Sequence, residues 1–202
     1  MGAPKKYDRE DLLKRAVELF RRNGFNGTST ADLVAELGIN RKSMYAEFGS
    51  KQGLFEASLV YYSENNLARV LAPIEAPDAG TFAIQQAFLG YANASKGWFL
   101  GRGCLMCNTA VERAALDAAS KAHVDSYLSR IESAFRNCLA NAVRTEDISK
   151  SADLDRLARF LTTAMIGVAA LIRAEARAEQ VEAACDSIAD LLAYHRPHTQ
   201  SG

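Results

Sequence analysis

The segment that decides the fold, residues 28–55, reads TSTADLVAELGINRKSMYAEFGSKQGLF. Its apolar residues recur at intervals of three and four, which indicates short amphipathic helices. Ser29 can cap a first helix, and Asp32 follows three residues later, as in a capping box. This helix is expected to end at Gly38, because glycine accepts the left-handed conformation common just beyond a helix C-terminus. Asn40 can then cap a second short helix.

A glycine corner between two short helices is typical of a helix-turn-helix, since the tight corner favours a residue without a Cβ. In the second helix, Met44 and Phe48 are expected to face inward with Leu33, Val34, Leu37 and Ile39. Three polar residues are left in its first turn: Arg41, Lys42 and Ser43. Such motifs present this turn to the major groove of DNA.

Eight residues are therefore candidate DNA contacts: Thr28, Ser29, Thr30, Arg41, Lys42, Ser43, Tyr45 and Lys51. Arginine can bind guanine through two hydrogen bonds, and hydroxyls at a helix N-terminus suit a phosphate. Cations at helix N-termini oppose the macrodipole, and an anionic neighbour would reverse that effect. Each residue also has a purely structural alternative, as a helix cap or as a packed tyrosine with a solvated hydroxyl.

The rest of the chain shows helical periodicity throughout. A first helix is expected over residues 9–22, before the segment quoted above, and a fourth over about 51–71. Pro73, Pro77 and residues 78–80 predict a loop. Further helices are expected over residues 81–95, 104–116, 118–144, 154–178 and 180–194. No alternating pattern long enough for a sheet is present, so the fold class is all-α.

Composition sets further bounds. The chain of 202 residues has a formal net charge of +0, yet residues 1–51 hold ten basic and seven acidic residues and carry +3, which leaves −3 for the remainder. A basic end on an acidic remainder is compatible with a DNA partner at that end. Four scattered cysteines, the missing apolar leader and the missing membrane span predict a cytoplasmic protein with reduced thiols.

The run GFNGTSTADLVAELGINRKSMYAEFGSKQGLF, residues 24–55, resembles the N-terminal domain of the TetR family of bacterial transcriptional regulators. The resemblance implies that Thr28, Tyr45 and Lys51 bind the DNA backbone and that residues 41–43 read the bases. It departs from the family at Ala46-Glu47, where larger or more basic residues are common. We expect Glu47 to point away from phosphate or to reduce non-specific affinity.

The resemblance also implies two domains and a homodimer. Residues 1–50 are expected to form a three-helix DNA-binding head, and residues 51–202 a helical bundle for effector binding and dimerisation. The partner is a near-palindromic double-stranded operator, and the last two helices pair across a twofold axis. Apolar stripes support that pairing, although they could instead fill the core of one protomer: Leu157, Phe160, Leu161, Ala164, Val168, Leu171 and Ile172, then Val181, Ala184, Ile188, Leu191 and Leu192.

The segment GRGCLMCNTAVE, residues 101–112, is a second informative stretch. Cys104 follows glycine at an expected helix N-terminus, where the dipole and nearby Arg102 would lower a thiol pKa. Similar Gly-Cys-Leu segments occur in a branch of the TetR family, some members of which sense electrophiles or oxidants through a cysteine, and this resemblance makes Cys104 a candidate sensor of either. The alternative is that Cys104 and Cys107 are small buried residues. Zinc is disfavoured, because no second Cys pair or His pair follows at ligand spacing.

An effector pocket is expected inside the C-terminal bundle, although aromatic and methionine residues at helical spacing also serve as plain core. Its candidate residues are Phe88, Tyr91, Trp98, Phe99, Cys104, Met106, Cys107, Tyr127 and Met165. The sequence thus predicts a repressor that a small molecule of unknown identity releases from DNA, or one triggered covalently at Cys104. An all-α enzyme is the remote alternative, and we find no catalytic motif, metal site or cofactor site for it.

Overall fold

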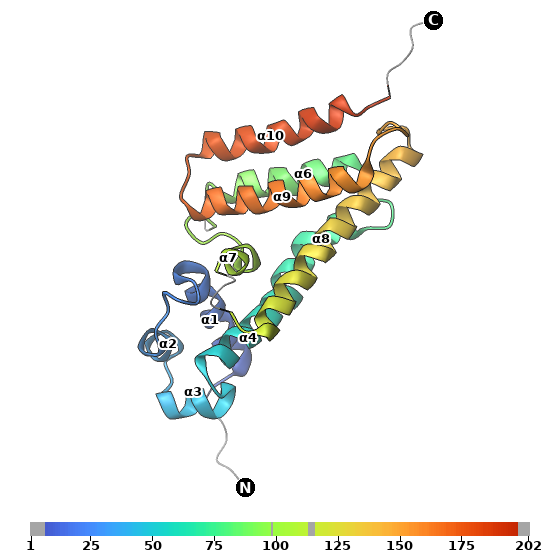
Figure 1. The fold of residues 1–202 in the computed structure, drawn as a ribbon. Helices are drawn as coiled ribbons and strands as arrows, with labels where there is room; N and C mark the ends of the chain where they lie inside the picture. The colour runs from blue at the N-terminus through green and yellow to red at the C-terminus, as the bar shows by residue number, and fades with distance from the viewer. Residues whose placement is uncertain (1–6, 98, 113–115, 198–202) are drawn as a thin grey trace, which may run out of the picture. The chain divides into compact units, whose positions relative to one another are not determined.

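A computed structural model describes residues 7–97, 99–112 and 116–197. Every regular element in these ranges is helical, which confirms the all-α prediction (Figure 1). The elements are α1 (Arg9–Asn23), α2 (Thr30–Leu37), α3 (Arg41–Phe48), α4 (Lys51–Tyr62), the π-helical turn η1 (Ser63–Leu67), α5 (Ala68–Glu75), α6 (Thr81–Ala94), α7 (Leu105–Val111), α8 (Ala118–Arg144), α9 (Leu154–Arg173) and α10 (Ala178–Tyr194).

The helices group into two compact units. The first contains the chain up to Leu67 together with Cys104–Val124, and the second contains Ala68–Gly103 and the chain from Asp125 onward. α8 therefore begins in the first unit and continues in the second. The boundary predicted between residues 50 and 51 separates a DNA-binding part from an effector-binding and dimerisation part, and it stays a prediction.

The first unit is built on α1. This helix begins at Arg9 because the Asp8 carboxylate accepts a hydrogen bond from the Glu10 amide at 2.9 Å. Phe20 of α1 meets Phe55 of α4 edge to face, with ring centroids 4.8 Å apart. The core around them confirms the inward positions predicted for the head, except that Val34 and Ile39 are only half-buried. Its buried residues include Leu12, Leu13, Ala16, Val17, Leu33, Leu37, Met44 and Phe48.

The fourth helix differs from the prediction. α4 ends at Tyr62, and the chain continues through the wide turn η1 into α5, which contains Pro73. The Asn65 side chain donates to the Tyr61 carbonyl at 3.0 Å within this turn, as is common where a helical ladder widens. Pro73 was expected to mark a loop, but it lies inside α5, and the following Ile74 is buried.

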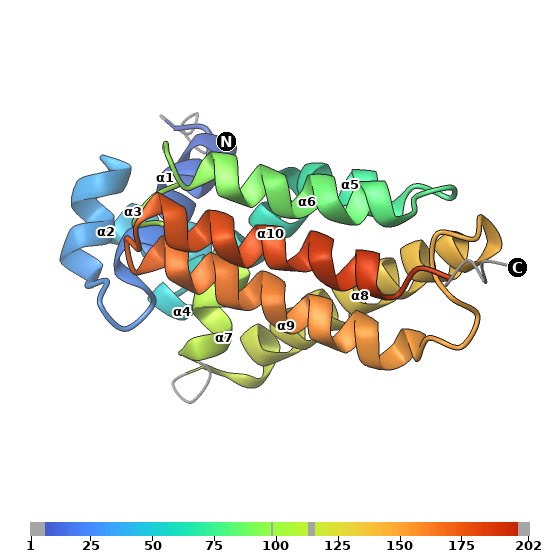
Figure 2. The same cartoon turned by 90° about the horizontal axis from the view of Figure 1, so that it is seen from above.

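The second unit is a bundle in which α6, α9 and α10 run side by side, and α5 lies beside α6 (Figure 2). Apolar stripes face its interior at helical spacing. Phe160 of the predicted stripe lies outside this interior, because it is 51% exposed. The buried positions of α9 and α10 are Leu157, Leu161, Met165, Val168, Ile172, Val181, Cys185, Ile188 and Leu192.

Two further helices are shorter than expected. α7 spans seven residues, with Cys104 as its N-cap and Glu112 as its C-cap. α9 ends at Arg173 rather than near residue 178, because Glu175 adopts a left-handed conformation with φ of 54° and turns the chain toward α10. Both differences concern where the helix ends, and hydrophobic periodicity alone defines helix ends poorly.

Candidate nucleic-acid interface

The corner between α2 and α3 has the geometry expected of a helix-turn-helix. Gly38 has φ of 65° and its amide donates to the Val34 carbonyl, which ends α2. A Cβ at Gly38 would meet only the Arg15 side chain, at 3.8 Å, so the residue is needed for its backbone conformation rather than for space. Asn40 then caps α3 by accepting a hydrogen bond from the Ser43 amide at 2.8 Å.

The N-terminal turn of α3 is cationic and open. Arg41 and Lys42 are exposed and Ser43 is half-buried, whereas Met44 is completely buried on the opposite side. No acidic residue lies in this turn. The helix dipole and two cations therefore give one positive surface, which is electrostatically suited to a polyanion.

Tyr45 organises this surface. The Arg41 guanidinium donates from Nη2 to the Tyr45 hydroxyl at 3.2 Å, and its Cζ lies 5.4 Å from the centroid of the tyrosine ring. The hydrogen bond with Arg41, followed by one with Thr30, holds the pKa of Tyr45 below its ordinary value of 10.0. The first residues of α2 and α3 thus converge on one phenol oxygen.

The three hydroxyl residues before and at the start of α2 have different roles. Ser29 is the exposed N-cap: its Oγ accepts from the Asp32 amide at 3.1 Å, and its own amide donates to the Asp32 carboxylate at 2.8 Å. Thr30 begins the helix and is half-buried. Thr28 is completely buried, and its Oγ1 donates to the Gly24 carbonyl at 2.6 Å. In this conformation the Thr28 hydroxyl faces inward and holds the turn, and the phosphate contact expected of it stays a prediction.

Lys51 is the first residue of α4, immediately after the N-cap Ser50, whose Oγ accepts from the Gly53 amide at 2.9 Å. The Lys51 Nζ lies 4.3 Å from the centroid of the Phe25 ring. Partial burial lowers the pKa of Lys51, and the charge of Glu112 opposes that shift. The lysine is thus partly desolvated and fixed beside a helix N-terminus.

Glu47 is covered by the N-terminal end of α1. Its side chain is 7% exposed and its Oε1 lies 3.3 Å from the Arg9 Nε. The Tyr7 hydroxyl donates to the other carboxylate oxygen at 3.4 Å, and the Arg9 guanidinium lies over the Phe48 ring. Glu47 therefore ties α3 to α1. No local pattern in the sequence indicated this role for Arg9 or Tyr7, because Tyr7 and Glu47 are 40 positions apart.

The residues predicted to bind an effector divide between the two units, and those in the described ranges are buried. Phe88, Tyr91, Phe99, Tyr127 and Met165 lie in the second unit, and Cys104, Met106 and Cys107 lie in the first. Trp98 is outside the described residues. Phe88 stacks on Phe135 with centroids 6.0 Å apart, and Tyr91 meets Phe99 edge to face at the same distance. Their role in effector binding stays a prediction.

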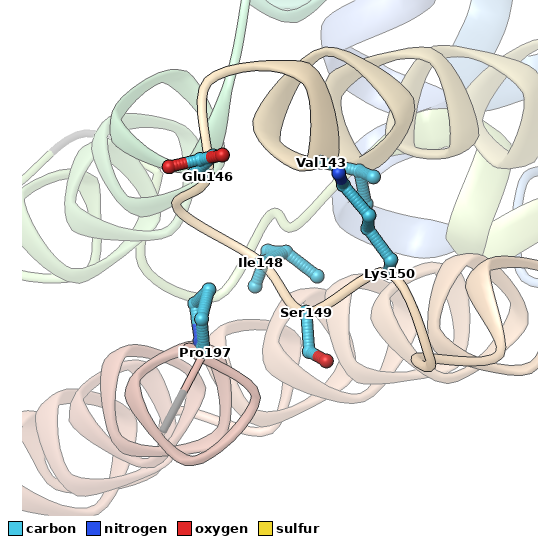
Figure 3. A pocket seen from close by; sticks show the side chains of 6 residues that line it. All are labelled: Val143, Glu146, Ile148, Ser149, Lys150 and Pro197. Atoms are coloured by element: carbon cyan, nitrogen blue, oxygen red, sulfur yellow. The ribbon is translucent and has the colours of Figure 1, made fainter. Parts of the chain in front are cut away.

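A pocket of about 300 Å³ lies elsewhere in the second unit, where the end of α8, the loop before α9 and the segment after α10 meet (Figure 3). Its lining combines apolar with polar side chains. None of these residues was predicted as an effector contact: Val143, Glu146, Ile148, Ser149, Lys150 and Pro197.

All four cysteines are buried, and burial raises the pKa values of Cys138 and Cys185 to about 11. His123 lies 4.0 Å from Glu56 on a partly exposed helix surface. Among the described residues, no group of three His, Cys, Asp or Glu side chains could hold a metal ion. No described helix is long and apolar enough to cross a membrane.

Comparisons with known proteins agree with this architecture. Residues 12–58 match the family described as bacterial regulatory proteins, tetR family, and residues 82–188 match the tetracyclin repressor-like C-terminal domain. The uncharacterized HTH-type transcriptional regulator YezE of Bacillus subtilis is 29% identical over 90% of this chain and 94% of its own. The HTH-type transcriptional repressor ComR of Escherichia coli is 28% identical over 89% of this chain and 86% of its own.

A solved structure has the same fold along most of its length. The TetR family transcriptional regulator CifR, solved as a cysteine mutant complexed with 26-bp double-strand operator DNA, superposes with a TM-score of 0.79. It is 23% identical and the match covers 92% of this chain and 97% of CifR. The two family matches together span both the helix-turn-helix and more than half of the chain. The chain therefore belongs to the TetR family of bacterial regulatory proteins.

Proposed function

We propose that this protein represses transcription as a homodimer on a near-palindromic operator and that a small-molecule effector releases it. The observation that carries the proposal is the exposed pair Arg41 and Lys42 on the first turn of α3, directly after the glycine corner. ComR is a repressor and CifR was solved with operator DNA, which supports the same role here. Action on chromosomal DNA requires a cytoplasmic protein, and we propose that location.

Each side chain of the interface has a proposed task. Arg41 reads a base edge, because a guanidinium can form two parallel hydrogen bonds with guanine. Lys42 and Ser43 bind a base edge or a phosphate. Four residues bind the DNA backbone and fix the register of α3: Ser29, Thr30, Tyr45 and Lys51. Thr28 is left out of this set because its hydroxyl is buried.

A face of α9 and α10 fits the proposed dimer. Exposed residues recur along α9 at intervals of three and four, and most of them are small: Phe160, Thr163, Gly167, Ala170 and Ala174. Ala183 and Ser187 continue the face on α10. Small side chains allow helices to approach closely, and a twofold axis brings the same surface of each protomer together. Pairing would set the two α3 helices about 34–36 Å apart, or a multiple of that, on the operator.

Effector release requires differential binding. The dimer can adopt one conformation whose DNA-binding heads match the operator and another whose heads are wrongly spaced. A ligand that binds the second conformation more tightly shifts the population toward it, and the ratio of its two affinities limits the size of the shift. We propose the buried aromatic residues of the second unit, Phe88, Tyr91 and Phe99 among them, as the place where it binds. A thermal-shift screen of small molecules tests this directly, because a ligand that binds the folded state raises the melting temperature.

A gel-shift titration with the intergenic DNA that flanks the gene tests the proposed function. We expect a complex with this DNA that weakens steeply as salt is raised. A coding fragment of equal length is the control and should bind far more weakly. Equal binding to both fragments, or to neither, would refute an operator-specific regulator.

Covalent triggering at Cys104 is the second candidate. It is favoured by the position of Cys104 as the N-cap of α7, and the solved CifR chain is a cysteine mutant. Because Cys104 is only 1% exposed, α7 must open before an electrophile can reach the sulfur. Cys104→Ser should abolish release of DNA by an electrophile, whereas Cys138→Ser should leave it unchanged. Normal release from the Cys104→Ser protein would exclude this trigger.

A further inference from the structure

Two side chains of the α7 segment are fastened to the chain just ahead of the helix-turn-helix, all within the first unit. The Asn108 amide donates from Nδ2 to the Arg21 carbonyl at 3.4 Å. One turn later, the Glu112 carboxylate accepts through Oε2 a hydrogen bond from the Asn26 backbone amide at 3.1 Å. The second contact joins residues 86 positions apart and lies in the turn that leads from α1 into α2.

The turn is shaped to receive this carboxylate. Gly24 has φ of 74°, and a Cβ built there would lie 2.0 Å from the Glu112 Oε1 and 2.9 Å from its Cδ. Any other residue would therefore displace the Glu112 carboxylate as well as strain the backbone. The absence of a side chain at Gly24 leaves a space that the Glu112 carboxylate fills, and the Asn26 amide donates a hydrogen bond to this carboxylate. A solvated surface glutamate would require none of this.

The same carboxylate acts on the proposed DNA contact Lys51. Its charge raises the pKa of that lysine against the lowering effect of burial. Lys51 is in turn packed over Phe25, which belongs to the turn between α1 and α2. Glu112 thus influences both the turn and the cation that follows the helix-turn-helix.

We propose that Glu112 is a positioning residue for DNA binding, which fixes the entry into α2 by holding the turn at Gly24 and Asn26. The proposal rests on the proposed function. If the turn is released, α2 and α3 sample orientations that do not match the groove. The apparent affinity for DNA then equals the intrinsic affinity multiplied by the fraction of molecules in the matching orientation. The negative charge of Glu112 has the opposite effect, since it weakens the attraction between Lys51 and phosphate.

Three substitutions of Glu112 separate the effect of its side-chain length from the effect of its negative charge. Glu112→Gln keeps an oxygen at the same distance but removes the charge, whereas Glu112→Asp keeps the charge but shortens the side chain by one methylene. Glu112→Ala removes both. Glu64→Ala is the matched control, because Glu64 is an exposed glutamate of the same unit, located in η1.

Fluorescence anisotropy with the flanking intergenic duplex gives the affinities, and hydrogen exchange of the Asn26 amide reports the turn. We expect about five- to tenfold weaker binding for the Asp and Ala variants, about the net effect of losing one hydrogen bond, and faster Asn26 exchange in both. The Gln variant should bind within about twofold of wild type or more tightly, as should Glu64→Ala. Thermal melting of each variant checks that the fold is kept, and the Asp and Gln pair remains decisive if the Ala variant unfolds.

Wild-type affinity and wild-type Asn26 exchange in the Asp variant would overturn the proposal. So would a loss in the Gln variant as large as in the Asp variant, because an oxygen at the right distance would then not be enough to hold the turn. Failure of the wild-type protein to bind the duplex at all would instead refute the proposed function, so the two failures are distinguishable.

Discussion

Arg41 and Tyr45 form a side-chain pair on the exposed face of α3. The Arg41 guanidinium donates to the Tyr45 phenol oxygen at 3.2 Å and lies over the tyrosine ring. The two residues are one helical turn apart, which brings their side chains together. Tyr45 therefore limits the rotamers of Arg41 before DNA arrives. A side chain ordered in advance loses less entropy when it binds.

Removing only the phenol hydroxyl tests this ordering together with the proposed contact between Tyr45 and the DNA backbone. Tyr45→Phe keeps the ring beneath the guanidinium but removes the hydrogen bonds with Arg41 and Thr30. We expect about fivefold weaker operator binding, the effect of one net hydrogen bond, and an unchanged melting temperature. Anisotropy titration measures the first and calorimetry the second. Tighter binding by the Phe variant would show instead that Tyr45 restrains Arg41 in an unproductive position.

The corner at Gly38 can be tested by a substitution that adds one methyl group. Gly38→Ala puts a Cβ on a backbone with φ of 65°, and we expect a loss of roughly 1–2 kcal/mol in the free energy of unfolding. Space is not limiting, because the nearest atom is the Arg15 Nη1 at 3.8 Å. Gly90→Ala in α6 is the control: its Cβ would enter open space within a helix, so it should stabilise by about 0.5–1 kcal/mol. Urea unfolding compares the two, and equal effects would contradict the argument.

The capping box makes part of the stability depend on pH. Hydrogen bonds with the Ser29 hydroxyl and then with its amide hold the pKa of the Asp32 carboxyl below its ordinary value of 3.8. A group whose pKa is lowered by folding stabilises the protein above its unfolded pKa and loses that effect as pH falls through the lower, folded pKa. Wild type should therefore be more stable than Asp32→Asn at neutral pH, and the gap should shrink below about pH 4. A gap that does not change with pH would argue against this account of the cap.

The exposed face of α9 predicts the oligomeric state. Gly167→Arg places a long charged side chain where the glycine now faces open space in one protomer. We expect this variant to sediment as a folded monomer while the wild-type protein sediments as a dimer, because two arginines would meet near the twofold axis. Gly90→Arg on α6 adds the same charge at an exposed glycine of another helix and should remain a dimer. If the wild-type protein sediments as a monomer, the proposed dimer is wrong, and the near-palindromic operator inferred from it no longer follows.

Local signals predicted the helix-turn-helix well. Ser29 with Asp32, Gly38 and Asn40 act through neighbours within four residues, so spacing alone identified their capping and turn roles. The helix over residues 118–144 was also predicted within its observed bounds. In these cases the propensity of each residue and the tertiary packing favour the same structure.

The sequence misled where direction or distance mattered. A threonine before a helix can turn its hydroxyl outward or inward, and only the position of the Gly24 carbonyl shows that Thr28 turns inward. Pro73 predicts a loop from its own chemistry, yet it lies inside α5, next to the buried Ile74. The contact between Glu112 and Asn26 spans 86 residues, and no local pattern encodes it.

The most direct test of the central claim is an anisotropy titration of wild-type protein and Arg41→Ala against two duplexes at several salt concentrations. One duplex is the bound region of the intergenic DNA, and the other is a scrambled duplex of equal length and composition. We expect Arg41→Ala to lose roughly 1–3 kcal/mol on the specific duplex and much less on the scrambled one, because it removes a base contact. If wild type does not distinguish the two duplexes, or if Arg41→Ala binds the specific one as wild type does, α3 does not read DNA through Arg41.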